Sequence, residues 1–384
     1  MGKLKKMEIE NNNNVNSNYP QIIDKRFKQI RFNMEDNKVE AAWITYLPNI
    51  RYLTNFSGSS AILLILPNKI CFFTDDRYTE QIKLELFDIP GMETYITRDP
   101  LNFCLQNNLL NGVLKIGIEA EYITYNDGMN LRSVFMSGRK IKIVPIVSLV
   151  EKFTQPKSKE ELGYIQASCK IAEATFEKLI NDVIKPGISE IDIAIELEYI
   201  SRKLGSTGTA FETIVVTGSR GAIVHGQPSK AKIKKNDILL IDFGCKVNGF
   251  CSDITRTICV GKPTKEQKSI YSLLYTAMSS AINEARPGMK GAYLDNIARH
   301  MIEEAGYGEY FQHSLGHGLG LVCHEKPSIS FRFKDQVVPE DVVLAIEPGI
   351  YLPGRFGMRV EDDIVVTQSK AIKLTNAPEE LLCL

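Results

Sequence analysis

The C-terminal part of the chain contains an internal repeat. The segment KPGISEIDIAIELEYISRKLG at residues 185–205 aligns without gaps with RPGMKGAYLDNIARHMIEEAG at residues 286–306. Each copy has a basic-Pro-Gly turn, an amphipathic helical pattern and a terminal Gly suited to ending a helix. The offset of about 100 residues is too long for a solenoid repeat. Unless the similarity is due to chance, it predicts two copies of one helix–helix–sheet unit.

The residues around each copy repeat the same order of elements. Ser158 with Glu161, and Thr264 with Gln267, have the spacing of a capping box, which predicts that a long helix precedes each copy. After each copy comes an apolar strand that ends in an acidic residue, DILLID in the first and DVVLAIE in the second. The repeated unit therefore carries acidic groups at matching places.

The N-terminal part has a different pattern. Strand and helix patterns alternate over residues 21–152, as in an α/β unit, and AILLILPNKICFFTD predicts a hairpin. The polar run KFTQPKSKEE follows and marks a boundary. We expect a mixed α/β (α+β) fold with a disordered Asn-rich tail at residues 1–20, one domain at 21–152 and a second at 153–384.

Four carboxylates lie at or near apolar strands of the second domain, where a charge is costly unless a cation pairs with it. They are Asp242 in ILLIDFG, Asp253 in FCSDITRT, Glu347 in LAIEPGIY and Glu361 in MRVEDDIVV. Two divalent ions would neutralise them, and His317 in SLGHGLG adds an imidazole. An oxygen-rich set with one imidazole favours Mn²⁺, with Co²⁺ or Zn²⁺ as alternatives. Two adjacent metal ions are typical of hydrolases.

Local geometry supports this grouping. A turn at Asn248-Gly249 predicts a hairpin that pairs Asp242 with Thr255 and places Asp253 diagonally across from Asp242. A solvated edge hairpin is the alternative, but ILLID is too apolar for that position. Each half of the repeat then supplies two of the four acids.

Arg359 and Glu361 alternate in MRVE, so we expect one strand to direct both side chains to the same face. Arg359 could then reach and orient a metal-binding carboxylate. The alternative is an exposed acidic run at residues 361–363.

Histidines are concentrated near these motifs. His313 and His324 lie with His317 within twelve residues, among glycines that allow a ligand to approach the backbone closely. His225 lies in IVHGQPS. We expect these three additional histidines, His225, His313 and His324, to contact substrate. His300 lies in a plain helical pattern and is expected to have a surface or packing role.

Composition limits the alternatives. The chain has 46 Lys plus Arg and 46 Asp plus Glu, so no basic character indicates a nucleic-acid partner. No apolar run approaches the roughly 18 residues of a membrane helix, and the N-terminus lacks the apolar core of a secretory signal. Eight scattered cysteines without a CxxC pair indicate reduced thiols. We therefore expect a cytoplasmic protein without a membrane or nucleic-acid partner.

Together these motifs resemble the pita-bread metallopeptidases, which include Xaa-Pro aminopeptidases, Xaa-Pro dipeptidases (prolidases) and, more distantly, methionine aminopeptidases. FETIVVTG, HGQPS, IDFG, GFCSDITRT, GHGLGL, IEPGIY and RVED follow the family order over roughly residues 155–384. NIRYLTNFSGSS and FFTDDRYTEQ look like the creatinase-type N-terminal domain of the proline-specific branch.

The resemblance implies roles for individual residues. It assigns two divalent metal ions to Asp242, Asp253, His317, Glu347 and Glu361. It makes Glu347 a general base as well, puts His225, His313 and His324 around the substrate, and matches Arg359 to an arginine that supports the ligands.

The resemblance also implies an activity. We expect an Xaa-Pro aminopeptidase that acts on peptides with proline at the second position, and a homodimer. Prolidase is the alternative within the same class. A creatinase-like amidinohydrolase would lack the metal ligands, and non-catalytic pita-bread proteins have usually lost some of them.

Overall fold

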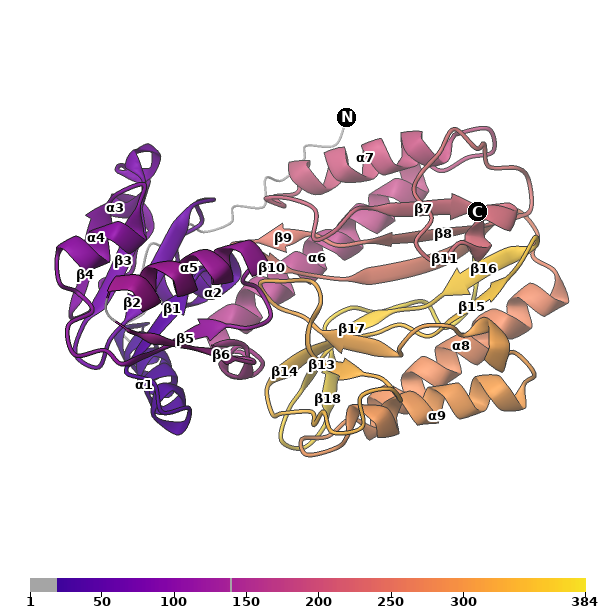
Figure 1. Ribbon diagram of the computed structural model, residues 1–384. Helices are drawn as coiled ribbons and strands as arrows, with labels where there is room; N and C mark the ends of the chain where they lie inside the picture. The colour runs from indigo at the N-terminus through magenta and orange to yellow at the C-terminus, as the bar shows by residue number, and fades with distance from the viewer. Residues whose placement is uncertain (1–18, 139) are drawn as a thin grey trace. The chain divides into compact units, whose positions relative to one another are not determined.

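The computed structural model describes residues 19–138 and 140–384. The tail expected at residues 1–20 lies outside this range except for Tyr19 and Pro20, which begin the first helix. The chain divides into two compact units, one ending at Phe153 and one spanning Thr154–Leu384. The two units are coloured from indigo to magenta and from magenta to yellow in Figure 1.

The N-terminal unit is a six-stranded sheet covered by helices, with strand order β4-β3-β2-β1-β5-β6. Its strands are β1 (Ala41–Ile44), β2 (Ala61–Ile65), β3 (Ile70–Thr74), β4 (Met92–Ile96), β5 (Lys115–Glu119) and β6 (Lys142–Ile146). Its helices are α1 (Tyr19–Asp36), α2 (Leu47–Thr54), α3 (Gln81–Glu85), α4 (Pro100–Gln106) and α5 (Tyr125–Gly138). The β2–β3 hairpin is the one that the sequence predicts.

The two faces of this sheet have separate cores. Trp43 and Phe73 lie on the face against which α4 and α5 pack. Phe72, the neighbour of Phe73, points to the opposite face and meets Phe56 at the end of α2 with ring centroids 5.2 Å apart. Adjacent residues of a strand point to opposite faces, so the apolar run of β3 can fill both cores.

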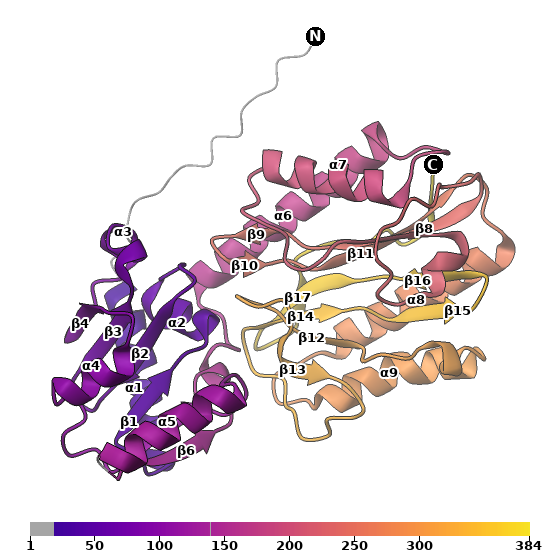
Figure 2. The ribbon, with the colours of Figure 1, turned by 45° about the horizontal axis from the view of Figure 1, so that its top comes forward.

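The second unit has two sheets with a pair of helices outside each (Figure 2). Helices α6 (Lys159–Asp182) and α7 (Glu190–Lys203) cover one sheet, and α8 (Lys265–Glu284) and α9 (Gly291–Glu304) cover the other. The first sheet contains β7 (Ile214–Thr217), β8 (Asp237–Phe243), β11 (Ile254–Val260) and β19 (Leu382–Cys383). The second contains β12 (Gly316–Gly318), β13 (Glu325–Ile329), β14 (Val342–Ile346), β17 (Asp362–Val366) and β18 (Ala371–Lys373). Two short hairpins add β9 (Lys246–Val247) with β10 (Phe250–Cys251), and β15 (Gly349–Leu352) with β16 (Phe356–Arg359).

The internal repeat is confirmed in this unit. Both expected capping boxes are formed, at the starts of α6 and α8. Gly187 and Gly288 both have positive φ, and their N–H groups donate equivalent hydrogen bonds to the carbonyls of Ile233 (2.8 Å) and Val338 (2.9 Å). The result is the pseudo-twofold pita-bread arrangement that the resemblance implies.

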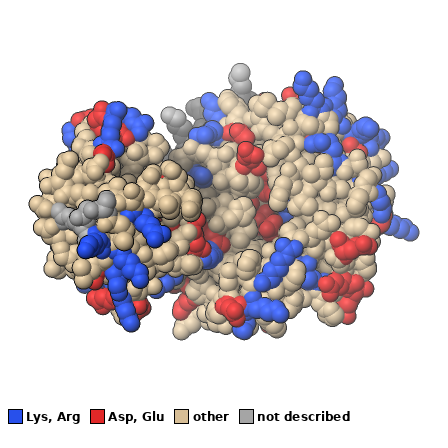
Figure 3. Space-filling model, in the orientation of Figure 1, with Lys and Arg blue, Asp and Glu red and all other residues tan. Residues whose placement is uncertain are grey.

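Charged side chains of both signs are interspersed on the face of each unit that Figure 3 shows. This agrees with the equal numbers of acidic and basic residues in the chain.

Candidate active site

Strand ends of both halves supply the four carboxylates. Asp242 lies in β8, and Asp253 comes directly before β11. Glu347 comes directly after β14, and Glu361 lies between β16 and β17. Asp242 pairs with Thr255 in the register that the Asn-Gly turn predicts. Each acidic residue lies at or next to one end of an apolar strand. The four carboxylates can therefore meet in one place while the other strand residues stay in the core.

One expectation about local structure was wrong. Arg359 and Glu361 do not share a strand, because β16 ends at Arg359 and β17 begins at Asp362. The two side chains nevertheless meet at the same cluster, through the hydroxyl of Thr255. The Arg359 Nε donates to Thr255 Oγ1 at 2.9 Å, and Thr255 Oγ1 donates to Glu361 Oε2 at 2.7 Å.

The carboxylates surround the imidazole of His317. Its Nε2 lies 3.6 Å from Asp253 Oδ2 and 3.8 Å from Glu347 Oε1. One ligand atom from each of Asp253, His317 and Glu361 lies within 4.8 Å of the others. This spacing leaves room for a cation between them.

The protonation of His317 supports such a cation. Its Nδ1 lies 3.0 Å from the carbonyl of Gly318, which can only accept, so we place the proton on Nδ1. Burial lowers the pKa of His317 to about 4, which keeps the ring neutral. The lone pair of Nε2 therefore faces two carboxylates, an arrangement that is unfavourable unless a positive ion lies between them.

The carboxylates themselves also need a cation. Burial, and then repulsion by neighbouring carboxylates, raises the pKa of Asp253 and of Glu361 well above the usual range. Burial likewise raises the pKa of Glu347 to about 8, although the charge of Arg359 opposes it. The buried Oδ1 of Asp242 has no hydrogen-bond partner among the described residues. Buried carboxylate oxygens that repel one another or lack a hydrogen-bond partner are suitable ligands for hard divalent cations.

Arg359 is the only Lys or Arg among the described residues that line this cavity. Its guanidinium contacts Asp242 directly, lies 3.8 Å from Glu347 Oε2 and donates to the hydroxyl of Tyr351 at 2.6 Å. The expectation that Arg359 reaches one of the carboxylates is met at Asp242. One guanidinium cannot neutralise four carboxylates, so the need for further positive charge remains.

Two polar partners escaped the sequence interpretation. Thr255 and Tyr351 are almost completely buried and join Arg359 to Glu361 and to His313. The sequence did place both residues near the site, since Thr255 pairs with Asp242 in the predicted hairpin and Tyr351 belongs to the IEPGIY motif. The sequence could not show which residues Thr255 and Tyr351 contact, because these contacts join segments that are distant in the chain.

The three additional histidines differ in their surroundings. The Nδ1 of His313 lies 2.8 Å from the carbonyl of Ser314, so its Nε2 is left to accept from the Tyr351 hydroxyl at 2.8 Å. His313 therefore lines the cavity with both ring nitrogens engaged by other described residues. His225 and His324 are exposed and line the cavity, and the His324 ring lies 4.3 Å from that of His317.

The cavity above the cluster has a volume of about 100 Å³. Phe211, Ile214 and Val224 form its apolar lining, and the carboxylates, histidines and Arg359 form its polar lining. A lining with both apolar and polar groups suits a small substrate that carries both kinds of group.

Buried acids fix the loops that carry two of the histidines. Glu190 accepts from the backbone of Thr217 and Ser229 and from Arg220, on both sides of His225. In the other half, Asp295 accepts two hydrogen bonds from Arg299 and one from the backbone of Leu315.

Arg299 in turn donates to the carbonyls of Phe311 (2.9 Å) and His313 (2.8 Å). Both loops are thus held by charge-assisted hydrogen bonds, which are stronger than neutral ones.

Comparison with known proteins identifies the family. Residues 163–368 match metallopeptidase family M24, and residues 26–153 match the creatinase/prolidase N-terminal domain. The chain belongs to metallopeptidase family M24. The M24 match spans the whole carboxylate and histidine cluster, and a family of metallopeptidases agrees with a cluster whose ligand atoms are spaced to hold a metal ion.

Individual M24 relatives agree with this assignment. The Xaa-Pro dipeptidase of Pyrococcus furiosus is 42% identical over 359 residues, covering 92% of this chain and 98% of the relative. The structure of an Xaa-Pro dipeptidase from Bacillus anthracis superposes with a TM-score of 0.88 at 35% identity, covering 94% of this chain and 100% of that one.

An X-Pro aminopeptidase structure from Thermotoga maritima gives a TM-score of 0.85 at 35% identity, covering 94% of this chain and 99% of that one. Both proline-specific activities thus occur among similar proteins.

Within the described part of this M24 protein, no helix is both long and apolar enough to cross a membrane.

Proposed function

We propose that this protein is an Xaa-Pro dipeptidase (prolidase) that hydrolyses dipeptides with proline in the second position. The observation that carries the proposal is the buried cluster of four carboxylates around the neutral His317, at the base of a cavity of about 100 Å³. The relatives named Xaa-Pro dipeptidase, including the one that is 42% identical, support this substrate class.

Asp242, Asp253, His317, Glu347 and Glu361 hold two divalent metal ions in this proposal. The four negative charges of the carboxylates equal the positive charge of two divalent ions. Because most of the ligand atoms are oxygens, the set favours Mn²⁺ over Co²⁺ or Zn²⁺. When bound, the ions neutralise the cluster and make water a stronger nucleophile near neutral pH. Arg359 and Thr255 keep the carboxylates oriented through the hydrogen bonds described above.

The other residues bind the substrate and move protons. An Xaa-Pro bond is a tertiary amide without an N–H, so its proline ring needs an apolar wall more than a hydrogen-bond acceptor. Phe211, Ile214 and Val224 provide that wall. Glu347, which lines the cavity, takes a proton from the attacking water and gives one to the leaving proline nitrogen.

The exposed histidines complete the substrate contacts. His324 and His225 line the cavity and donate to the substrate carbonyl and carboxylate. His313 acts indirectly, because its hydrogen bond to Tyr351 supports Arg359.

The aminopeptidase expected from the sequence remains the second candidate. Its support is the Thermotoga maritima X-Pro aminopeptidase, which is as similar in identity as the Bacillus anthracis dipeptidase. The relatives named dipeptidase favour the shorter substrate.

One assay separates the two candidates. Turnover of Met-Pro is compared with that of Met-Pro-Gly, with Mn²⁺ and after treatment with a chelator. A dipeptidase cleaves Met-Pro at least about tenfold faster in kcat/KM, a difference of about 1.4 kcal/mol. Faster cleavage of the tripeptide would establish the aminopeptidase, and full activity in chelator would contradict the metal site.

Two further features belong to the proposal. All eight cysteines are free, and seven of them are buried, which supports a reducing compartment such as the cytoplasm. A homodimer is proposed from the family resemblance alone, and light scattering of the purified protein tests it.

A further inference from the structure

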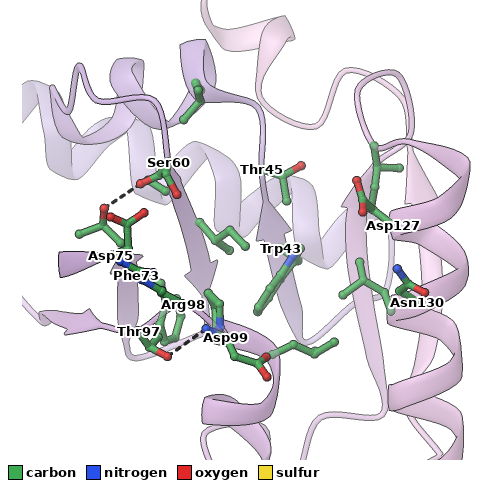
Figure 4. Close-up of a pocket in the computed structure, with 18 of the residues that line it drawn as sticks. Trp43, Thr45, Ser60, Phe73, Asp75, Thr97, Arg98, Asp99, Asp127 and Asn130 are labelled. Atoms are coloured by element: carbon green, nitrogen blue, oxygen red, sulfur yellow. Dashed lines mark hydrogen bonds between the residues drawn. The ribbon is translucent and has the colours of Figure 1, made fainter. Parts of the chain in front are cut away.

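The N-terminal unit has a large pocket of its own, distant in sequence from the metal cluster. Its volume is about 590 Å³, within the range of small-molecule sites. All of its lining residues lie between Trp43 and Leu131, so the pocket is formed by this unit alone. Figure 4 shows the pocket with the side chains of most of its lining residues.

The position of the pocket in the sheet is one where α/β proteins bind ligands. Strands β1, β3 and β4 run in the same direction, since β2 is antiparallel to both β1 and β3 and β4 is parallel to β3. The pocket is lined by residues at the carboxyl ends of these strands, namely Thr45, Asp75 and Thr97. In sheets of this kind, ligands bind outside the carboxyl ends, where the strand order reverses. The order reverses at β1, which has β2 on one side and β5 on the other.

The base of the pocket is apolar with one unsatisfied donor. Its apolar lining includes Trp43, Ile62, Phe73, Leu101, Ile123 and Leu131. Trp43 is only 2% exposed, and its indole N–H has no hydrogen-bond partner within residues 19–138 and 140–384. This donor is therefore available to a hydrogen-bond acceptor that a ligand brings into the pocket.

The walls carry excess negative charge. The lining contains Asp75, Asp99 and Asp127 but only one cation, Arg98. Arg98 is already bound to Asp76, which lies outside the lining. The pocket therefore presents acidic groups without a free cation of its own.

Among the three acids, Asp127 is the one available to a ligand. Arg77 binds both oxygens of Asp75, and the backbone and amide of Asn102 occupy those of Asp99. Asp127 accepts only from the hydroxyl of Thr124, at 2.7 Å, and its other oxygen has no partner in the described part of the chain. In Figure 4, Asp127 and Asn130 lie on one wall, Asp75, Thr97, Arg98 and Asp99 on the other, and Trp43 lies between them.

From this arrangement we infer that the pocket binds a small molecule with an α-ammonium group next to a carbonyl oxygen and an apolar side chain. The ammonium pairs with Asp127, the oxygen accepts from the Trp43 N–H, and the side chain fills the apolar base. This chemistry is that of a free apolar amino acid or of the N-terminal residue of a peptide. The site is separate from the proposed peptidase centre and does not depend on its activity.

Trp43 is also the only tryptophan of the chain, so its fluorescence reports on this pocket directly. The full-length protein with Mn²⁺ is titrated with L-leucine, L-leucinamide and N-acetyl-L-leucinamide while indole emission is recorded. We expect a saturable change with leucine, leucinamide or both, at concentrations up to about 10 mM. Binding of leucine alone identifies free amino acids as the ligand, and binding of leucinamide alone identifies peptide N-termini.

Matched variants test the assigned contact. Asp127→Asn keeps the size of the side chain and removes its charge, so binding should weaken at least tenfold. Asp36→Asn, at the exposed end of α1, should leave binding unchanged. Neither variant should change peptidase activity.

Four results would overturn the proposal. They are the absence of a saturable change with leucine and leucinamide, equal binding of the acetylated compound, unchanged binding by Asp127→Asn, and loss of the signal in chelator. The last result would place the ligand at the metal cluster, because none of the five proposed metal ligands lines this pocket.

Discussion

Glu190 and Asp295 have the same function in the two halves of the catalytic unit, although they lie one helical turn apart in the repeat. Glu190 is the first residue of α7 and aligns with Gly291, whereas Asp295 is four residues further along α9. Both are completely buried, and each binds the loop that brings a histidine to the cavity. The two halves therefore keep the buried acid while its exact position on the helix has shifted.

Replacing Asp295 tests whether this anchoring matters for catalysis. Asp295→Asn removes the charge that faces Arg299, which should lower the free energy of unfolding by about 1.5–3 kcal/mol. The loop that holds His313 is then less well placed, and kcat should fall roughly ten- to hundredfold. Urea unfolding and Met-Pro hydrolysis measure the two effects. Glu304→Gln, on the exposed side of α9, is the control and should change stability by less than about 0.5 kcal/mol.

Thr255 links Arg359 to Glu361, and its removal should weaken metal binding. Thr255→Val keeps the shape but leaves Arg359 Nε without its acceptor and Glu361 Oε2 without its donor. We expect a loss of about 10- to 100-fold in metal affinity, measured by titrating activity with Mn²⁺.

Thr257→Val is the matched control for this prediction. Thr257 lies on the same strand, and its hydroxyl hydrogen-bonds to the backbone of Arg359. This variant should lower stability with little change in metal affinity, and equal losses in the two variants would contradict a specific role of Thr255.

Much of the site could be predicted because local sequence determines it. The positive φ values of Asn248 and Gly249 show that the Asn-Gly turn forms as expected, and the turn sets the register that pairs Asp242 with Thr255. The capping boxes and the Pro-Gly turns likewise act within a few residues. Features of this kind need no knowledge of tertiary contacts.

Other features depend on contacts that the sequence does not specify. Helix α5 is rich in Asn, Asp, Gly and Ser, which favour helices weakly, and was not predicted. Leu131 and Phe135, one turn apart, are buried against the sheet, and this packing stabilises the helix. The hydrogen bonds of Tyr351 to His313 and Arg359 are also tertiary, so these partners of His313 and Arg359 could be found only in the structure.

The state of His313 has a direct spectroscopic consequence. Burial, and then the charge of Arg359, lowers the pKa of His313 to about 3, against about 6.5 in an unfolded chain. Between these two pH values the unfolded state binds a proton at His313 that the folded state does not bind. His313 therefore lowers the free energy of unfolding as the pH falls from 6.5 to 3. The ring proton resonance of His313 is identified as the one that is absent from the spectrum of the His313→Gln variant. In the wild-type protein this resonance should not shift between pH 8 and pH 5. A midpoint above pH 5 in this NMR titration would contradict the prediction.

Removal of metal should make stability depend on pH in the opposite direction. In the metal-free protein the pKa of Glu347 is raised to about 8, whereas an unfolded glutamate has a pKa of about 4.3. The folded state then holds a proton that the unfolded state releases, so stability falls as the pH rises from about 4.3 to 8. Chelator-treated protein should be inactive and have a lower Tm at pH 8 than at pH 5.5. Added Mn²⁺ should restore activity and raise the Tm at pH 8 with increasing concentration, because it binds only the folded state. Glu361→Gln should show a much smaller rise, and a wild-type Tm that does not respond to Mn²⁺ at pH 8 would contradict the assigned metal site.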